Sequence, residues 1–431
     1  MGEGIDPRRA VPRTDALLND PRLASASQRL GRDLVKEAIS AAQDAVRQGV
    51  IGPDQAADLA VASLPASSTT LRAVLNATGV VLHTNLGRAP LSSAAVTALQ
   101  HAAGYVDVEY DVATGERARR GRGALEALAA AVPDARDVHV VNNGAAALLL
   151  TATALARGRE IIVSRGELVE IGDGFRLPDL LESTGAQLRE VGTTNRTNLE
   201  DYRRAVSPQT AFVLKVHPSN FVVRGFTSAA SVAEVASLGV PVVVDVGSGL
   251  LQPDPLLPDE PNAADALRAG ASLVTASCDK LLGGPQGGLL LGRADLIAEL
   301  RRHPLARALR VDKMTLAALE ATLRGPAPPT HAYLHADVGA LQTRAAHIAE
   351  ELRGAGLGAA VVPSDGVVGG GGAPGAVLSG WAIALPAAFG AALRLGDPCI
   401  VTRVERDRCL IDVRCVPEDR DPDIVKAVLA V

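Results

Sequence analysis

SCDKLLGGPQGG (residues 277–288) decides how this chain folds, because it places a lysine between a buried strand and a glycine-rich turn. The run before it, SLVTA (272–276), has the apolar, β-branched character of a strand covered on both faces. A lysine at such a strand end is partly desolvated, which lowers the pKa of its amine and makes it nucleophilic toward an aldehyde. Lys280 is therefore predicted to be a Schiff-base lysine; a surface lysine in a glycine-rich turn is the alternative.

A second apolar run, VPVVVDVGSG (240–249), carries Asp245 at the end of its predicted strand. A carboxylate there costs free energy unless a cation or a hydrogen-bond donor compensates it. The pyridinium N–H of pyridoxal phosphate is such a cation; capping of the following turn is the alternative. Asp245 and Lys280 are separated by about one strand–helix unit, which is the spacing of fold type I, aspartate-aminotransferase-like enzymes. The pair predicts pyridoxal 5′-phosphate as the cofactor.

The cofactor's phosphate and ring need further partners. VVNNGAAALLL (140–150) reads as a strand, a turn at Asn143, Gly144 and Ala145, and then a helix. Backbone N–H groups at such a helix N-terminus can bind a phosphate, although the same pattern occurs in ordinary strand-to-helix turns. His217 is one candidate for the residue that stacks on the ring.

The chain divides into three predicted parts: a helical N-terminal domain (1–68), a large cofactor-binding domain (69–325) and a small α+β domain (326–431). Predicted strands of the large domain are 138–141, 160–163, 211–216, 240–246, 272–276 and 288–292, with helices at 144–156, 231–238 and 262–269. This alternation indicates an α/β fold with a mostly parallel sheet covered by helices on both faces. The last part has a predicted helix at 337–354 and strands at 376–384, 399–404 and 409–415; GVVGGGGAPG (366–375) is predicted to be a flexible loop.

The composition of the chain argues against several classes of protein. The 431 residues carry a formal net charge of −5, which argues against a general nucleic-acid coat protein. Four cysteines without a CxxC pair indicate reduced thiols and no metal site. The first residues lack a signal-peptide core, and the longest charge-free stretch, 366–393, contains prolines and glycines that preclude an unbroken membrane helix. We expect a soluble, cytoplasmic protein without membrane contact.

Arginines cluster twice, in GERARRGR (115–122) and in HPLARALRVDK (303–313). Guanidinium groups bind phosphate bidentately, so either cluster is a candidate for a phosphorylated co-substrate or an RNA backbone. A solvated helix face is the alternative, and for 115–122 taken alone it is the favoured interpretation.

Further motifs resemble those of bacterial selenocysteine synthases, the L-seryl-tRNA(Sec) selenium transferases. They are LNATGVVLHTNLGRAPLS (75–92), EYDVATGER (109–117), VSRGELVEIGDGFRLPD (163–179), EVGTTNRTNLEDY (190–202), KVHPSNFVVRGFT (215–227), DVGSG (245–249), DKLLGGPQGG (279–288) and PLARALRVDKMTLAALEATL (304–323). The resemblance covers nearly the whole chain. It implies that the N-terminal domain binds the tRNA. It also implies that the protein forms a ring-shaped homodecamer, a pentamer of dimers with catalytic sites at dimer interfaces.

The resemblance also implies site residues and a reaction. Lys280 would hold the cofactor with Asp279 beside it, and Arg88, Arg307 and Arg310 would bind the phosphate of selenophosphate. Ser-tRNA(Sec) would lose its serine hydroxyl by β-elimination to an aminoacrylyl ester, to which selenium then adds, giving Sec-tRNA(Sec). The sequence departs from the family pattern at Cys278 and Gly144, where the family usually has Gly and Asn. We expect Cys278 to be buried.

Two other functions stay open at this stage. One is a pyridoxal-phosphate lyase or desulfurase for a free small molecule, built on the same scaffold. The other is a tRNA-binding protein without activity, against which the retention of Lys280, Asp279 and Asp245 argues.

Overall fold

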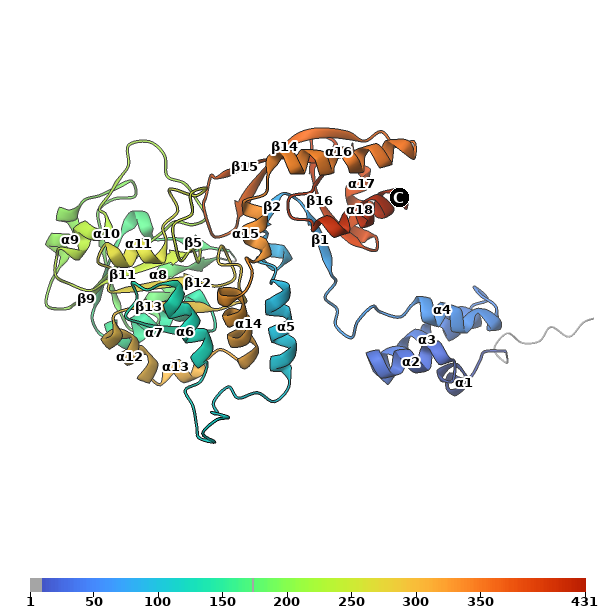
Figure 1. The fold of residues 1–431 in the computed structure, drawn as a ribbon, viewed down its shortest axis with the longest axis horizontal. Helices are drawn as coiled ribbons and strands as arrows, with labels where there is room; N and C mark the ends of the chain where they lie inside the picture. The colour runs from blue at the N-terminus through green and yellow to red at the C-terminus, as the bar shows by residue number, and fades with distance from the viewer. Residues whose placement is uncertain (1–9, 173) are drawn as a thin grey trace, which may run out of the picture. The chain divides into compact units, whose positions relative to one another are not determined.

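The computed structural model describes residues 10–172 and 174–431, which divide into two compact units, one ending at Ala73 and the other running from Val74 to Val431. Each unit has its own hydrophobic core. Figure 1 shows the helices and strands of both units.

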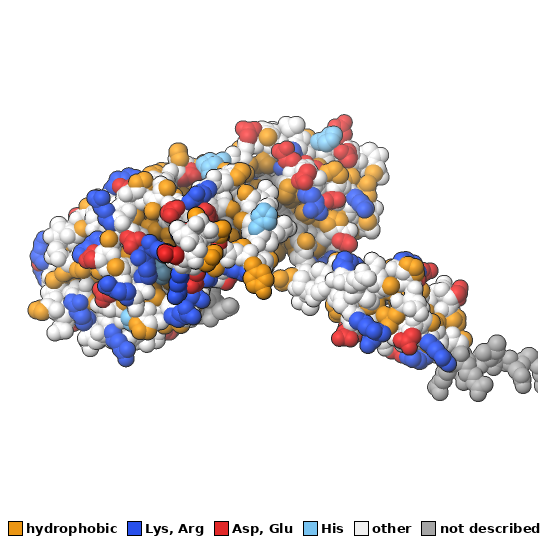
Figure 2. Space-filling model, turned by 60° about the horizontal axis from the view of Figure 1, so that its bottom comes forward, with side chains coloured by type: hydrophobic (Ala, Val, Ile, Leu, Met, Phe, Trp, Pro, Cys, Tyr) orange, Lys and Arg blue, Asp and Glu red, His pale blue; other side chains and the backbone are white. Residues whose placement is uncertain are grey.

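The N-terminal unit is helical, as predicted. Its helices are α1 (Thr14–Leu18), α2 (Pro21–Leu30), α3 (Arg32–Arg47) and α4 (Ala56–Ala62). Asp20 caps α2 by accepting a hydrogen bond from the Arg22 backbone N–H, and Gly31, with φ of 91°, permits the direct turn from α2 into α3. Apolar residues at helical spacing in α3, including Val35 and Ile39, are fully buried. On the face shown in Figure 2, basic and acidic side chains are interspersed on this unit.

The large domain is built on a seven-stranded sheet in the order β3-β13-β12-β11-β9-β4-β7. Its strands are β3 (Asp137–Val141), β13 (Gly288–Gly292), β12 (Leu273–Ser277), β11 (Val242–Gly247), β9 (Thr210–Val216), β4 (Glu160–Ser164) and β7 (Gln187–Val191). Only β13 runs antiparallel to its neighbours, so the sheet is mostly parallel. All six predicted strands are confirmed.

Helices cover both faces of this sheet, as predicted. On one face α7 (Gly144–Ala156), α8 (Leu177–Glu182) and α12 (Ala294–Arg302) share a buried cluster with alternate strand residues such as Val243. On the other face lie α6 (Arg122–Ala131), α9 (Leu199–Ala205), α10 (Val232–Ala236), α11 (Ala263–Arg268) and α14 (Lys313–Arg324), which pack with Val242 and Val244. The helix α5 (Ser93–Ala103) runs beside α14 (Figure 1).

The small domain contains a six-stranded sheet in the order β1-β16-β17-β15-β14-β2. Its strands are β1 (Val74–Ala77), β16 (Cys399–Glu405), β17 (Arg408–Asp412), β15 (Val377–Pro386), β14 (Ala360–Gly369) and β2 (Val80–Leu82). Residues 74–82 were expected in the large domain, but parallel pairing with β16 and β14 places them in this sheet. Helices α16 (Val338–Gly354), α17 (Ala388–Leu395) and α18 (Asp421–Leu429) complete its core.

The glycine-rich segment differs from its predicted form. Residues 366–369 are the end of β14 and not a loop. They are glycine-rich because β2 passes close by: a Cβ on Gly366 would lie 2.7 Å from the Gly79 carbonyl oxygen, and one on Gly369 would lie 2.6 Å from Val80 Cγ1. Only the remainder, from residue 370, is a turn.

Within the described ranges 10–172 and 174–431, none of the helices combines the length and the apolar character that crossing a bilayer requires.

Candidate functional site

Lys280 follows β12 directly and sits in a tight, hydrogen-bonded turn. Its carbonyl accepts from the Gly283 N–H at 2.9 Å, and the Leu281 N–H donates to the Ser248 carbonyl at 2.9 Å. Burial lowers the pKa of the Lys280 amine, while the carboxylates of Asp245 and Asp279 oppose that shift. The structure thus gives this lysine the partly desolvated amine expected of a nucleophile.

Asp245 lies at the carboxyl end of β11, directly beside Thr275 of β12 in the sheet register. The Thr275 hydroxyl donates to Asp245 Oδ1 at 2.8 Å. Burial raises the pKa of Asp245, and the Thr275 hydrogen bond counteracts only part of this effect. A carboxylate in this position needs a cation nearby to remain ionised.

Arg88 and Asp279 come together beside Lys280, as the resemblance implied for this part of the site. Arg88 Nη1 donates to Asp279 Oδ2 at 2.7 Å. Arg88 has a left-handed backbone, with φ of 64°, and its N–H donates to the His83 carbonyl at 3.1 Å. This conformation is uncommon for a residue with a side chain and clusters at functional sites.

The glycine-rich turn after β14 covers the lysine. A Cβ on Gly371 would lie 2.7 Å from Lys280 Cε, and a Cβ on Gly372 would lie 3.2 Å from Ser248 Cβ. Glycine is therefore required here because the turn packs directly on the Lys280 side chain. No pattern in the sequence indicates that these two segments meet.

Replacing Gly371 with alanine should weaken cofactor uptake about tenfold or more, because overpacking of about 1–3 kcal/mol would displace Lys280. The backbone φ of 103° at this position adds strain for any residue with a side chain. Pyridoxal-phosphate affinity of the apoprotein, measured by fluorescence titration, tests this. Gly358→Ala is the matched control, since a Cβ there would meet no atom within 4 Å. Equal affinities of the two variants would contradict the packing argument.

The predicted phosphate turn connects β3 to α7. Asn143 is the helix N-cap, and its Oδ1 accepts from the Ala146 N–H at 2.8 Å. A Cβ on Gly144 would lie 2.6 Å from Ser277 Oγ, so Ser277 occupies the space that a side chain at residue 144 would need. The N–H groups of Gly144 and Ala145 lie in the first turn of α7, whose dipole favours an anion.

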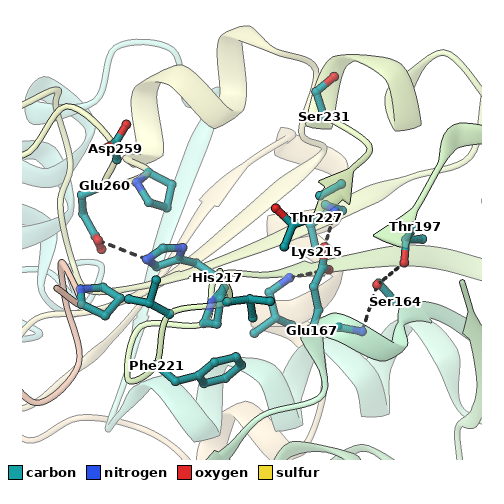
Figure 3. A pocket seen from close by; sticks show the side chains of 18 of the residues that line it. Ser164, Glu167, Thr197, Lys215, His217, Phe221, Thr227, Ser231, Asp259 and Glu260 are labelled. Carbon is teal, nitrogen blue, oxygen red and sulfur yellow. Dashed lines mark hydrogen bonds and ion pairs between the residues drawn. The ribbon is translucent and has the colours of Figure 1, made fainter. Parts of the chain in front are cut away.

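His217 follows β9 and is fixed by two hydrogen bonds. Its backbone N–H donates to the Asp245 carbonyl at 3.1 Å, and its Nε2 lies 3.1 Å from Glu260 Oε2 (Figure 3). The same Glu260 oxygen accepts from the Ala373 N–H at 2.8 Å, so Glu260 also holds the glycine-rich turn. Stacking of His217 on the ring stays a prediction, and Glu260 was not predicted because its sequence context carries no signal.

Arg307 and Arg310 lie together in a second place, a cavity of about 480 Å³. Arg310 pairs through its backbone with Val141, the last residue of β3, so the cavity adjoins the turn that precedes α7. Among the described contacts, none joins these two arginines to Arg88 within one chain. Of the predicted anion-binding arginines, Arg307 and Arg310 therefore lie together, and Arg88 lies apart from them beside Lys280.

Another cavity, of about 1010 Å³, is lined by other residues than Lys280. Its lining includes a buried ion pair between Lys215 Nζ and Glu167 Oε1, together with Phe221 (Figure 3). Lys215 also donates to the Tyr202 hydroxyl at 3.3 Å. Lys215 is buried and forms an ion pair with Glu167, whereas Lys280 is only partly buried and the pKa of its amine is lowered.

Cys278, which replaces the usual family glycine, is fully buried, as expected. Burial raises the pKa of its thiol, which keeps it protonated and unreactive at neutral pH.

The residues around Lys280 fit pyridoxal phosphate. A partly desolvated amine suits the cofactor aldehyde, Asp245 suits the pyridinium N–H, and the start of α7 suits the phosphate. The tight packing of Gly371 on the lysine side chain is consistent with a site built around this residue.

Two family models match this chain. The family model described as "L-seryl-tRNA selenium transferase" matches residues 74–417, and "Selenocysteine synthase N terminal" matches residues 8–47. L-seryl-tRNA(Sec) selenium transferases from Solidesulfovibrio magneticus and Hyphomonas neptunium are 42% and 41% identical; the alignments cover 98% and 97% of this chain and 97% of each relative.

A solved structure of D-glucosaminate-6-phosphate ammonia-lyase superposes with a TM-score of 0.58 at 20% identity, over 83% of this chain and 95% of that one. The predicted fold class, that of fold type I pyridoxal-phosphate enzymes, is confirmed. The chain belongs to the L-seryl-tRNA selenium transferase family.

Proposed function

We propose that this protein converts L-seryl-tRNA(Sec) to L-selenocysteinyl-tRNA(Sec), with pyridoxal phosphate as its cofactor and selenophosphate as the selenium donor. The observation that carries the proposal is that a partly desolvated Lys280 lies within electrostatic reach of the strand-end Asp245, in a chain of this family. We place the reaction in the cytoplasm, where aminoacyl-tRNAs are used.

Lys280 has two tasks in this proposal: it holds the cofactor and then, once free, removes the proton from the seryl Cα. A lowered amine pKa suits the second task, because a general base works best when its pKa lies near the operating pH. When bound, pyridoxal phosphate supplies the electron sink for the charge that develops at Cα. Asp245 would hold a proton on the ring nitrogen of the bound cofactor, and Asp279 fixes Arg88 beside the lysine.

The two separate groups of arginines support assembly into dimers. If Arg307 and Arg310 face the Lys280 site of a second copy, one complete site would combine both groups, as the homodecamer expected for the family would provide. The N-terminal unit would bind the tRNA. Light scattering of the purified protein tests the decamer, a pentamer of dimers.

Selenium incorporation tests the reaction. Purified protein, selenophosphate and Ser-tRNA(Sec) should give selenocysteinyl-tRNA, whereas other seryl-tRNAs and free serine should give none. Turnover of free serine or of an amino-sugar phosphate without any tRNA product would instead favour a lyase on the same scaffold. That alternative is kept because the ammonia-lyase named above shares the fold.

Replacing Arg307 with alanine should lower selenium transfer about tenfold or more, because each charge-assisted hydrogen bond to a dianion contributes about 1.5–3 kcal/mol. Cofactor content, read from the visible absorbance, should not change. Arg293→Ala is the control, because it removes an arginine that pairs with Asp295 on the surface and does not line this cavity. Loss of the cofactor in Arg307→Ala would contradict a role limited to the donor.

A further inference from the structure

The arginine cavity brings two distant segments together. Seven arginines line it: Arg117, Arg119, Arg120, Arg301, Arg302, Arg307 and Arg310. The first three belong to the segment 115–122, for which a solvated helix face was the favoured interpretation. Residues 115–121 precede α6 and are not helical, so the predicted helix is wrong, whereas Arg117 and Arg119 are exposed to solvent as that interpretation expected. This segment lies against the arginines that the family resemblance assigns to the selenium donor.

Glu109 is the centre of this cluster and the one carboxylate among the described residues that line the cavity. It contacts Arg120 at 3.2 Å, Arg117 at 3.2 Å and Arg310 at 3.4 Å. The pKa of Glu109 is lowered, chiefly by its hydrogen bond with Arg120, so Glu109 is ionised at neutral pH. One fixed anion thus holds guanidinium groups from both segments in place.

The cluster retains unused hydrogen-bond donors. In the described part of the chain, the buried Nε–H groups of Arg120 and Arg301 have no acceptor. The Nη groups of Arg120 are already engaged by Glu109 and by the Val311 carbonyl at 2.9 Å. A buried charged donor without a partner is unfavourable, so the arrangement is suited to receive an additional acceptor.

Basic side chains outnumber carboxylates around the cavity: seven arginines line it, against Glu109 in the lining and Asp137, which pairs with Arg119 and Arg301. His139, which also lines it, has its pKa lowered to about 4, by burial first and then by Arg301 and Arg119. It is therefore neutral at pH 7 and contributes a hydrogen-bonding ring without further charge. A small anion with several oxygens matches a site that has many cationic donors and few acceptors.

We propose that Arg120 joins Arg307 and Arg310 in binding a tetrahedral oxyanion of the phosphate class, and that Glu109 is a positioning residue acting through Arg120 and Arg310. The inference rests on the proposed function, since it identifies the oxyanion with the phosphate part of the selenium donor. It adds the segment 115–122 to a donor site otherwise assigned to Arg307 and Arg310.

Inorganic phosphate is the probe, titrated by calorimetry into the full-length, cofactor-loaded protein. Arg120→Ala should weaken phosphate binding about tenfold, because it removes a charge-assisted donor. The matched control is Arg293→Ala, which removes an arginine from the exposed pair with Asp295 and should leave binding unchanged. Unchanged phosphate binding in Arg120→Ala overturns the proposal.

Glu109→Gln separates positioning from folding. Removing a negative charge should leave phosphate binding equal or tighter, while kcat for selenium transfer falls about tenfold because the arginines lose their orientation. Asp295→Asn is the control for neutralising a carboxylate. Weaker phosphate binding together with a lower melting temperature in Glu109→Gln would mean a structural role and would overturn the positioning assignment.

Three sources of the phosphate group are distinguished by the kinetics of Arg120→Ala. A raised KM for selenophosphate alone supports the proposal. A raised KM for Ser-tRNA(Sec) alone assigns the cavity to the tRNA backbone, and lost pyridoxal phosphate assigns it to the cofactor; either result overturns it. If the wild-type protein binds phosphate at this site but transfers no selenium, the proposed function fails while the anion site stands.

Discussion

Replacing Lys280 with alanine should abolish selenium transfer, with a loss of at least about a thousandfold, because one side chain serves as both cofactor anchor and general base. Borohydride reduction followed by mass spectrometry should find a pyridoxyl group on the Lys280 peptide of the wild-type protein and none in the variant. The absorbance near 420 nm that a bound cofactor gives should disappear as well.

Two other lysines make this test specific. Lys426, which is exposed in α18, provides the control variant Lys426→Ala with unchanged activity. Lys215 is a buried lysine that forms an ion pair with Glu167. Finding the pyridoxyl group on Lys215 instead would overturn the assignment of Lys280 and the function built on it.

Replacing Asp245 with asparagine should lower turnover about 100-fold or more, since breaking a buried ion pair costs about 3–5 kcal/mol. An asparagine fits the same space but carries no charge to hold a proton on the cofactor ring. Thr275→Val is a graded comparison: it removes the 2.8 Å hydrogen bond to Asp245 but keeps the carboxylate. A loss of about tenfold is expected there.

Stability should respond to Asp245→Asn in the opposite direction. The pKa of Asp245 is raised in the folded protein, so the carboxyl destabilises the folded apoprotein as pH rises from the unfolded-state pKa through the folded-state pKa. At pH 7 the apo form of Asp245→Asn should melt at or above the wild-type temperature. Added cofactor should raise the melting temperature of the wild type more than that of the variant. A much less stable apo variant would show that the carboxylate is needed for folding.

Six of the seven strands of the large domain could be predicted because they are mostly buried, whereas the largely exposed edge strand β7 was not predicted. Runs such as 211–216 and 240–246 consist almost entirely of β-branched and other apolar residues, since both faces of a parallel sheet are covered. A charged residue at the end of such a run is conspicuous, which is why Asp245 and Lys280 could be identified as a pair. Charged side chains at these two positions, Asp245 and Lys280, are explained by binding of the cofactor and not by packing of the sheet.

The parts that could not be predicted depend on contacts between distant segments. The strands β1 and β2 are short, with three or four residues each, and nothing in them indicates a partner more than 280 residues away. Likewise, Glu109 meets Arg310 across 201 positions. Such side-chain partners follow from the assembled fold, so local patterns in the sequence do not reveal them.

The shared sheet of β1 and β16 has a consequence for the order in which the protein matures on the ribosome. The strands β1 and β2 are synthesised before their partners in the sheet. The strand β1 pairs with β16 and β2 pairs with β14, and both partners lie within residues 360–412. Until these partners are synthesised, the edges of β1 and β2 are unpaired, and an unpaired strand edge promotes intermolecular association. A nascent or truncated chain ending before residue 360 should therefore aggregate or recruit chaperones, although Lys280 is already present.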